Sequence, residues 1–311
     1  MNEKEKSQSS LLKFIEKDVK KDSFIYIKRK QNKIGKAIVD IPKPFLKWAG
    51  GKRQLIPQID PFFPKYYNNY IEPFVGGGAI FFYLLPEKAI LMDINEELIN
   101  TYKVIKNNIS DLIGLLNEHK NQREYYYNIR NADRNPNIFN ELTDIQKCSR
   151  TIYMNRCCYN GLYRVNSKGH FNVPFGKYKN PNFCDEENLE AVHRALQNAS
   201  LVNNSFEKCL DFAEKGDFVY FDPPYVPISD SANFTSYTKE NFGKNDQIKL
   251  FEVFKTLDER GCKLMLSNSY SEFTLELYED YKINVLRAKR AINSDPNNRG
   301  EIKELLITNC Y

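Results

Sequence analysis

The distribution of hydrophobic positions changes along the chain. From residue 70 onward, short apolar runs bounded by Gly, Pro, Asn or Asp alternate with segments whose apolar residues recur every three or four positions. The short runs predict buried strands, and the three-to-four spacing predicts helices with one buried face. The predicted strands are Tyr70–Val75, Ala89–Met92, Leu201–Asn203, Phe218–Phe221, Lys263–Ser267, Ile283–Leu286 and Glu304–Thr308. Strands that alternate with helices in this way are typical of a doubly wound α/β sheet.

A glycine turn joins the first two predicted strands. The first strand runs into Gly76-Gly77-Gly78, a helix is predicted over Ala79–Leu85, and Asp93 follows the second strand. Glycines let the backbone approach a ligand closely, and a carboxylate at the end of the second strand can accept hydrogen bonds from both hydroxyls of a ribose. The pattern predicts a nucleoside-containing cofactor, with a simple turn as the alternative. The cofactor is not NAD, because the third glycine of the fingerprint G-x-G-x-x-G is missing.

The alternation stops between residues 96 and 197. This stretch is predicted to form several helices, followed by a segment rich in Gly, Asn and Pro, Asn160–Pro181. We therefore predict an α/β core that is interrupted by a mostly helical insertion. Ahead of the core, residues 10–20 predict a short amphipathic helix and residues 24–27 a strand.

The tetrapeptide Asp222-Pro223-Pro224-Tyr225 follows a predicted strand directly. Two consecutive prolines restrict the backbone, so a carboxylate, a free carbonyl and an aromatic ring are held around one point. That arrangement suits a planar amino group, which can donate two N–H bonds while its base stacks on the ring. A proline-rich turn after a buried strand is the alternative.

Composition restricts the class of protein. The 311 residues are 41% hydrophobic and 27% charged, with a mean hydropathy of −0.58, which excludes both a disordered chain and a membrane protein. No apolar run approaches the roughly 18 residues of a bilayer span, and the N-terminus lacks the apolar core of a signal peptide. Seven cysteines without a C-x-x-C pair argue against a disulfide framework and a zinc site. We expect a cytoplasmic protein without a metal.

Charge is unevenly distributed. Residues 1–43 contain twelve Lys/Arg and six Asp/Glu, whereas the rest of the chain contains 33 basic and 34 acidic residues. The net charge of +5 therefore belongs to the N-terminal extension. A basic arm suits a polyanion such as nucleic acid, and a solvated tail is the alternative.

Taken in order, these motifs resemble those of the Dam-type (α-group, D12 class) DNA adenine N6-methyltransferases. The segments that carry the resemblance are Phe45–Lys52, Glu72–Gly78, Asp93, Asn160–Tyr178, Asp222–Tyr225, Ala232–Tyr237 and Arg299–Gly300. The runs Asn160–Asn166 and Phe171–Gly176 are especially similar to members that methylate GATC. The resemblance covers Pro44 to Tyr311.

The resemblance implies a fold and a domain organisation. A Rossmann-like methyltransferase sheet is expected from residues 44–95 and 198–311. A mostly helical target-recognition domain with a β-hairpin is expected from residues 96–197. The basic extension, residues 1–43, has no counterpart in the minimal enzymes of the family.

The resemblance also implies an activity and a site. S-adenosylmethionine would donate a methyl group to a flipped-out adenine in double-stranded DNA and leave as S-adenosylhomocysteine. The positions implied in catalysis are Asp222, Pro223, Pro224 and Tyr225. The positions implied in cofactor binding are Trp48, Lys52, Phe74, Gly76, Gly78, Asp93, Phe206 and Asp222. The positions implied in DNA binding are Lys47, Tyr159, Asn160, Leu162, Arg164, Pro174 and Lys177.

One site position departs from the pattern, and other functions stay open. Lys177 stands where some relatives have Arg, and a lysine cannot form the same bidentate contact. A methyltransferase acting on cytosine N4, RNA or a glutamine amide is one alternative. A non-catalytic DNA-binding module is another, although Asp93 and the tetrapeptide are intact. A restriction endonuclease that acts on the same site is a possible partner.

Overall fold

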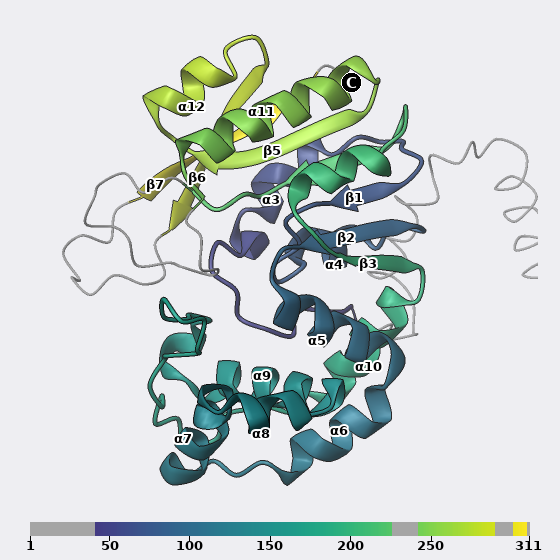
Figure 1. The fold of residues 1–311 in the computed structure, drawn as a ribbon. Coiled ribbons are helices and arrows are strands. Elements are labelled where there is room, and N and C mark those ends of the chain that lie inside the picture. The colour runs from purple at the N-terminus through teal and green to yellow at the C-terminus, as the bar shows by residue number, and fades with distance from the viewer. Residues whose placement is uncertain (1–40, 226–241, 290–300, 310–311) are drawn as a thin grey trace, which may run out of the picture. The chain divides into compact units, whose positions relative to one another are not determined.

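The computed structural model describes residues 41–225, 242–289 and 301–309, and Ile41–Tyr311 form one compact unit (Figure 1). Four predicted features lie outside the described residues. They are the helix over 10–20, the strand over 24–27, and the motifs Ala232–Tyr237 and Arg299–Gly300.

The core of this unit is a seven-stranded sheet with the order β3-β2-β1-β4-β5-β7-β6. The strands are β1 (Tyr70–Glu72), β2 (Ala89–Asp93), β3 (Ala199–Asn203), β4 (Phe218–Phe221), β5 (Lys263–Ser269), β6 (Lys282–Lys289) and β7 (Glu301–Thr308). Each includes or overlaps a strand that the hydrophobic pattern predicts. A mixed α/β fold with seven strands is the architecture expected of a methyltransferase.

The chain reverses its direction across the sheet at β1. From β1 the sheet is built outward through β2 and β3, and the chain then returns to place β4 on the other side of β1. The first five strands run parallel. The last strand, β7, is inserted antiparallel between β5 and β6, and Leu266 pairs with Ile307 in this part of the sheet.

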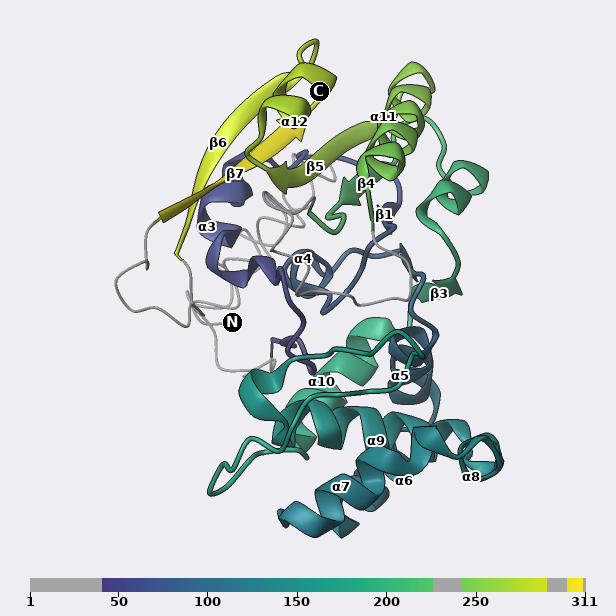
Figure 2. The ribbon, with the colours of Figure 1, turned by 60° about the vertical axis from the view of Figure 1, so that its left-hand side comes forward.

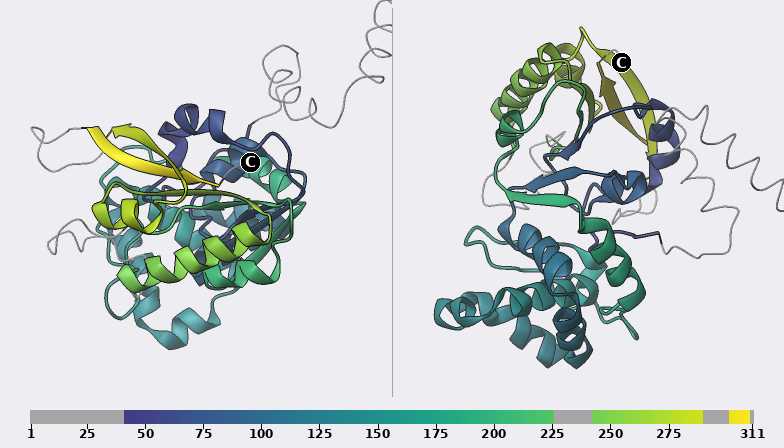
Figure 3. Two further views of the ribbon diagram at one scale, coloured as in Figure 1. Left: turned by 90° about the horizontal axis from the view of Figure 1, so that it is seen from above. Right: turned by 90° about the vertical axis from the view of Figure 1, so that its right-hand side faces the viewer.

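Two hydrophobic cores cover the two faces of the sheet, because successive side chains of a strand point to opposite sides. In β4, Phe218 and Tyr220 belong to one core, and Val219 and Phe221 belong to the other. Helices α11 (Lys244–Glu259) and α12 (Glu272–Leu277) lie on the face of the second core. Helices α3 (Ile56–Ile59) and α4 (Ala79–Leu84) lie on the first (Figure 3).

Six helices occupy the chain between β2 and β3. They are α5 (Glu96–Asn107), α6 (Ile109–Glu118), α7 (Arg123–Asn131), α8 (Pro136–Glu141), α9 (Asp144–Cys157) and α10 (Glu186–Leu196). Figure 2 shows them gathered below the sheet. The first core continues into them through residues such as Leu112, Ile152 and Val192, so these helices pack directly on the α/β core. The expected boundaries of a recognition domain at residues 96 and 197 stay a prediction.

The segment between α9 and α10 folds back on itself. Antiparallel bridges join Cys158 to Phe175 and Val165 to Phe171, and the Asn172 N–H donates to the Arg164 carbonyl. Val165, Phe171 and Val173 are buried in a third hydrophobic cluster together with Tyr126 and Tyr153 of the helices. The expected hairpin therefore has a packed base, although its bridges are too isolated to count as strands.

Candidate active site

The candidate catalytic and cofactor residues meet where the strand order reverses. Phe74 and the glycine turn follow β1, Asp93 ends β2, Phe206 follows β3, and Asp222 follows β4. The carboxyl ends of parallel strands lie at one edge of a sheet, and ligands of doubly wound folds bind in the crevice at such a reversal. The fold thus brings together residues that are almost 150 positions apart in the sequence.

Asp93 is bound to the glycine turn. Its Oδ2 accepts a hydrogen bond from the Gly76 N–H at 3.1 Å, and its Oδ1 accepts one from the Asn95 N–H at 2.9 Å. Burial raises the pKa of Asp93 to about 6, while the N–H donors of Asn95, Gly76 and Ile94 oppose the rise. A carboxylate offers about four acceptor positions, so Asp93 can still accept a further hydrogen bond.

Gly78 is required by both conformation and space. Its φ of +68° lies in the left-handed region, and a Cβ at this position would lie 2.6 Å from the Tyr102 hydroxyl oxygen. Tyr102 in turn donates a hydrogen bond to the Gly76 carbonyl at 3.0 Å. The turn before α4 is therefore held rigidly by a residue of α5.

Aromatic side chains line both sides of the turn. Trp48 packs against Gly76, where a Cβ would lie 2.8 Å from the indole Cδ1, and stacks on Tyr163 with ring centroids 4.8 Å apart. On the other side, Phe74 and Phe206 stack at 5.3 Å with planes 26° apart. Phe242 meets both of these rings edge-on.

Asp222, which is partly buried, forms an ion pair with a buried lysine at the end of β4. The Lys52 ammonium lies 2.7 Å from its Oδ1, and the Lys52 side chain is only 3% exposed. The same ammonium donates to the Gly50 carbonyl at 2.8 Å and lies 4.9 Å from the centre of the Tyr225 ring. The Asp222 carboxylate, the Gly50 carbonyl and the Tyr225 ring thus surround the Lys52 ammonium in this structure.

A second carboxylate, Glu304 of β7, completes this group. Glu304 accepts a hydrogen bond from the Tyr225 hydroxyl at 2.7 Å and lies 3.8 Å from the Lys52 ammonium. Burial raises the pKa of Asp222 to about 6; the Lys52 ammonium lowers it and the Glu304 carboxylate raises it further. Two carboxylates therefore compete for one ammonium in a buried site.

The predicted DNA-binding residues lie around the folded-back segment. Tyr159 is 56% exposed, and its N–H donates to the Pro174 carbonyl at 2.8 Å. Arg164 is partly buried, and its Nε donates to Asn172 Oδ1 at 2.7 Å. Asn160 and Lys177 have positive φ angles of 58° and 57°.

Leu162 and Lys47 complete this set. Leu162 is partly buried in the third hydrophobic cluster, and its carbonyl accepts from the Cys158 thiol at 3.2 Å. Lys47 is exposed on the segment before β1, and its ammonium lies 5.8 Å from the centre of the Tyr178 ring.

Comparison with known proteins decides the family. The model of the D12 class N6 adenine-specific DNA methyltransferase family matches residues 48–292. The chain belongs to this family. It is an adenine-specific DNA methyltransferase.

Similar proteins come from distant organisms. The type II methyltransferase M1.LlaDCHI of Lactococcus lactis is 47% identical over 86% of this chain and 95% of its own length. The type II methyltransferase M.MjaIII of Methanocaldococcus jannaschii is 46% identical over 86% of this chain and 99% of its own length. The DNA adenine methylase of Escherichia coli is 36% identical over 85% and 94%.

Membership implies S-adenosylmethionine as the methyl donor, and the methyltransferase has residues that fit it. The carboxylate of Asp93 is oriented by two backbone N–H groups at the end of β2, which suits a ribose. The stacked pair Phe74 and Phe206 offers an apolar surface for an adenine ring. Among the described residues, no group of three or more His, Cys, Asp or Glu is placed to hold a metal ion.

Sequence reasoning missed several side chains of this site. Glu304 was assigned only to the predicted strand Glu304–Thr308, yet a carboxylate at the start of that apolar run is a signal for a polar site. Tyr163 and Phe242 carry no such signal, because an aromatic residue in an apolar segment is normally part of the core.

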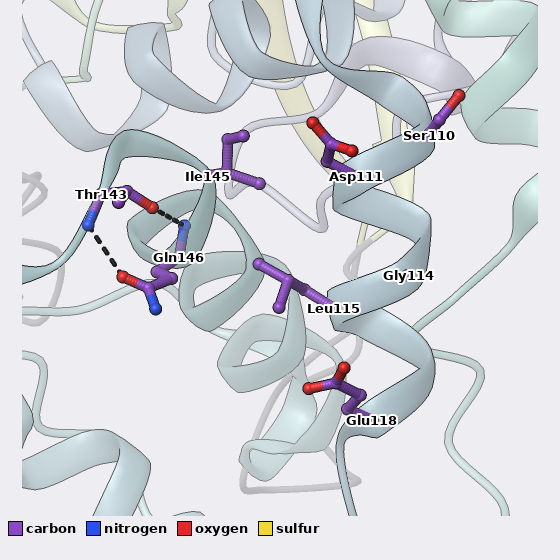
Figure 4. A pocket seen from close by; sticks show the side chains of 8 residues that line it. All are labelled: Ser110, Asp111, Gly114, Leu115, Glu118, Thr143, Ile145 and Gln146. Atoms are coloured by element: carbon purple, nitrogen blue, oxygen red, sulfur yellow. Dashed lines mark hydrogen bonds between the residues drawn. The ribbon is translucent and has the colours of Figure 1, made fainter.

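A cavity of about 450 Å³ lies between α6 and the start of α9, but none of the predicted site residues lines it (Figure 4). The lining residues are Ser110, Asp111, Gly114, Leu115, Glu118, Thr143, Ile145 and Gln146. Within the described ranges, no helix is both long and apolar enough to cross a bilayer.

Proposed function

We propose that this methyltransferase transfers a methyl group to N6 of an adenine that is flipped out of duplex DNA, within the sequence GATC. The buried group of Asp222, Lys52 and Tyr225 at the reversal of the strand order carries the proposal. In this group the Asp222 carboxylate and the Tyr225 ring surround the Lys52 ammonium, and the Gly50 carbonyl accepts a hydrogen bond from it. The names of the relatives, DNA adenine methylases and type II methyltransferases, agree with methylation of adenine in DNA.

Asp222 and the Pro223 carbonyl would orient the target amine. The lone pair of adenine N6 is conjugated with the ring, so the amine is a weak nucleophile. Two acceptors that each take one N–H bond would favour a tetrahedral nitrogen and point its lone pair at the methyl donor. Catalysis then rests on positioning and charge complementarity, without a strong base before transfer.

Cofactor binding would use the other strand ends. Asp93 would hold the ribose, Phe206 would pack on the adenine ring, and Trp48 and the glycine turn would border the methionine portion. S-adenosylmethionine supplies a methyl group that is activated by its sulfonium. Lys52 would give up part of its contact with Asp222 when a target amine binds, and Glu304 at 3.8 Å is its second partner.

The adenine must leave the helix, because N6 is paired inside duplex DNA. Tyr225 would stack on the extruded base, since the Glu304 hydrogen bond holds its hydroxyl in place. Tyr159 and Asn160 would fill the space that the base leaves. The high exposure of Tyr159 at the edge of the folded-back segment supports this role.

Sequence would be read from the same segment. Arg164 is suited to a bidentate contact with guanine O6 and N7, and its Nε is already held by Asn172. Leu162 and the exposed Pro174 are suited to the methyl group of thymine. Lys47 and Lys177 would supply further contacts from the edges of this surface.

The test is a methyl-transfer assay with labelled S-adenosylmethionine on unmodified duplex DNA, single-stranded DNA and RNA. The proposal predicts label on N6 of adenine in duplexes that contain GATC. It predicts a fall of roughly 100-fold or more for Asp222→Asn, because one of the two groups that orient the amine is weakened. Label on cytosine N4, on RNA or on protein would instead support the alternative substrates.

A further inference from the structure

Asn155 connects the cofactor segment to the recognition segment. This residue lies in the last turn of α9, and its side chain is fully buried. Its Oδ1 accepts from the Lys47 N–H at 2.9 Å, and its Nδ2 donates to the Lys47 carbonyl at 2.9 Å. The same Nδ2 donates to the Gly161 carbonyl at 3.1 Å. One carboxamide therefore binds both backbone polar groups of Lys47 and the turn at Gly161.

The side chain of Lys47 continues this contact to the surface. Gly161 has a φ of +65°, and a Cβ at this position would lie 2.3 Å from Lys47 Cδ. The aliphatic part of Lys47 thus runs directly over Gly161, in the turn that also contains Tyr159 and Asn160. The backbone of Lys47 is held by Asn155 and its stem packs on Gly161, whereas its ammonium lies 5.8 Å from the centre of the Tyr178 ring in an exposed residue.

Asn155 cannot itself contact DNA, because it is buried. It acts on DNA only through the groups that it holds. The neighbouring Arg156 adds a second anchor to the same loop by donating to the Phe45 carbonyl at 2.6 Å. The Phe45 anchor does not reach the recognition turn. Asn155 hydrogen-bonds both Lys47 and Gly161, and the stacking of Trp48 on Tyr163 is a separate contact between the two segments.

We propose that Asn155 is a positioning residue for sequence specificity. It fixes the position of Lys47 relative to the Tyr159–Gly161 turn, so that both contact DNA together. The inference rests on the proposed function, because it takes Lys47 and the turn as DNA contacts. It adds that these two contacts, from separate segments of the chain, work as one unit.

The experiment compares methylation rates on a GATC duplex and on duplexes with one base pair changed. Lys47→Ala is expected to reduce discrimination at one base pair by about 5- to 150-fold, the range of a lost base contact. Asn155→Ala is expected to reduce discrimination at that same base pair. Because Asn155 acts through Lys47 at that base pair, the double variant is expected to lose no more discrimination there than Lys47→Ala alone.

Gly161→Ala provides a second route if Asn155→Ala does not fold. It leaves the carboxamide in place but displaces the Lys47 stem, so it is expected to affect the same base pair. Asn309→Ala is the matched control. Asn309 also accepts from a backbone N–H, of Leu264, and donates to a backbone carbonyl, of Cys262, but far along the chain from the recognition segment. It is expected to lower stability without a change in discrimination.

The outcomes separate this inference from the proposed function. If the wild-type protein methylates no adenine in DNA, the proposed function itself is wrong. The inference alone is overturned if Lys47→Ala changes discrimination and the folded Asn155 or Gly161 variant does not. The inference would also be overturned if the losses of discrimination from Asn155→Ala and Lys47→Ala added fully in the double variant. An equal fall in the rate of Asn155→Ala on all duplexes would overturn it as well.

Discussion

The charge of the candidate site depends on Lys52, Asp222 and Glu304 together. The Lys52 ammonium is buried between Asp222 at 2.7 Å and Glu304 at 3.8 Å. Since the Lys52 ammonium lowers the pKa of Asp222 and the Glu304 charge raises it, changes at the two neighbours have opposite effects. The acid limb of the activity profile can therefore identify Asp222 as the titrating group.

The first prediction concerns this limb. Asp222 must be ionised to accept an N–H bond from the amine, so turnover should fall as the pH drops through about 6, the raised pKa of this carboxyl. Glu304→Gln removes the charge that raises this pKa. The acid limb should move to lower pH, as measured from kcat at saturating S-adenosylmethionine.

Lys52→Met is the opposing variant, because it removes the charge that lowers the pKa of Asp222. Its acid limb should move to higher pH. Tyr225→Phe removes only the hydrogen bond to Glu304 and leaves the charges of Lys52 and Glu304 in place. It therefore shows whether a shift of the acid limb comes from the lost hydrogen bond of the Tyr225 hydroxyl and not from a lost charge. Limbs that shift in the same direction in both charge variants would contradict this account. Saturating cofactor is needed because burial also raises the pKa of Asp93 to about 6.

At the scale of single elements, the turn before α4 makes the second prediction. Gly78→Ala forces a side chain into the left-handed region and towards the Tyr102 hydroxyl. It should destabilise the protein by about 1–3 kcal/mol and weaken cofactor binding, as measured by thermal unfolding and by titration with S-adenosylmethionine. Gly114→Ala, in α6, is the control, since a Cβ there meets nothing within 4 Å. Equal cofactor affinity in both variants would argue against the turn as part of the site.

The folded-back segment between α9 and α10 makes the third prediction. Arg164→Ala should reduce discrimination at one G·C pair by about 1–3 kcal/mol and leave cofactor affinity unchanged. Arg194→Ala is the matched control, because Arg194 is 57% exposed on α10 and pairs only weakly with Glu190 at 3.9 Å. A uniform loss on all DNA sequences would mean that Arg164 contacts a phosphate instead.

The sequence predicts where the strands lie along the chain better than it predicts which strands pair in the sheet. Short apolar runs locate all seven strands, because an apolar run between turn residues has few other uses. The place of β7 between β5 and β6 could not be predicted, since an apolar run indicates a strand but does not say with which strands it pairs. Glu304 was missed for the same reason: its partner Tyr225 is adjacent only after β7 has been inserted.

The recognition segment shows a second limit of sequence reasoning. Its turn residues and its basic and aromatic side chains could be named from the motifs. Asn155 could not, because a single Asn in a helix says nothing about the backbone groups it binds more than 100 positions away. The resemblance to a family supplied roles for individual residues that composition and spacing left open.

At the scale of the whole molecule, charge separates the extension from the compact unit. Ile41 begins the unit, and the Lys43 backbone is held by Asn188 of α10 through two hydrogen bonds of 2.8 and 3.0 Å. A truncation that tests the arm should therefore end at Asp40 and keep Lys43.

The fourth prediction is that removal of residues 1–40 flattens the salt dependence of DNA binding. Each phosphate contact that a Lys or Arg makes releases counterions, so the loss of a contacting arm reduces the slope of log K against log salt. Methyl transfer at low salt should be retained, because the site lies within the compact unit. An unchanged slope would assign the arm to a solvated tail.

The central claim is that Asp222 orients the N6 amine of adenine in DNA. The most direct test is to sequence plasmid DNA for N6-methyladenine from cells that express either the wild-type protein or Asp222→Asn, in a host without this modification. At the lowest expression that fully modifies GATC sites with the wild-type protein, the account predicts N6-methyladenine on both strands with the wild type and largely unmodified sites with the variant. Undiminished adenine methylation with a well-expressed Asp222→Asn protein would contradict it.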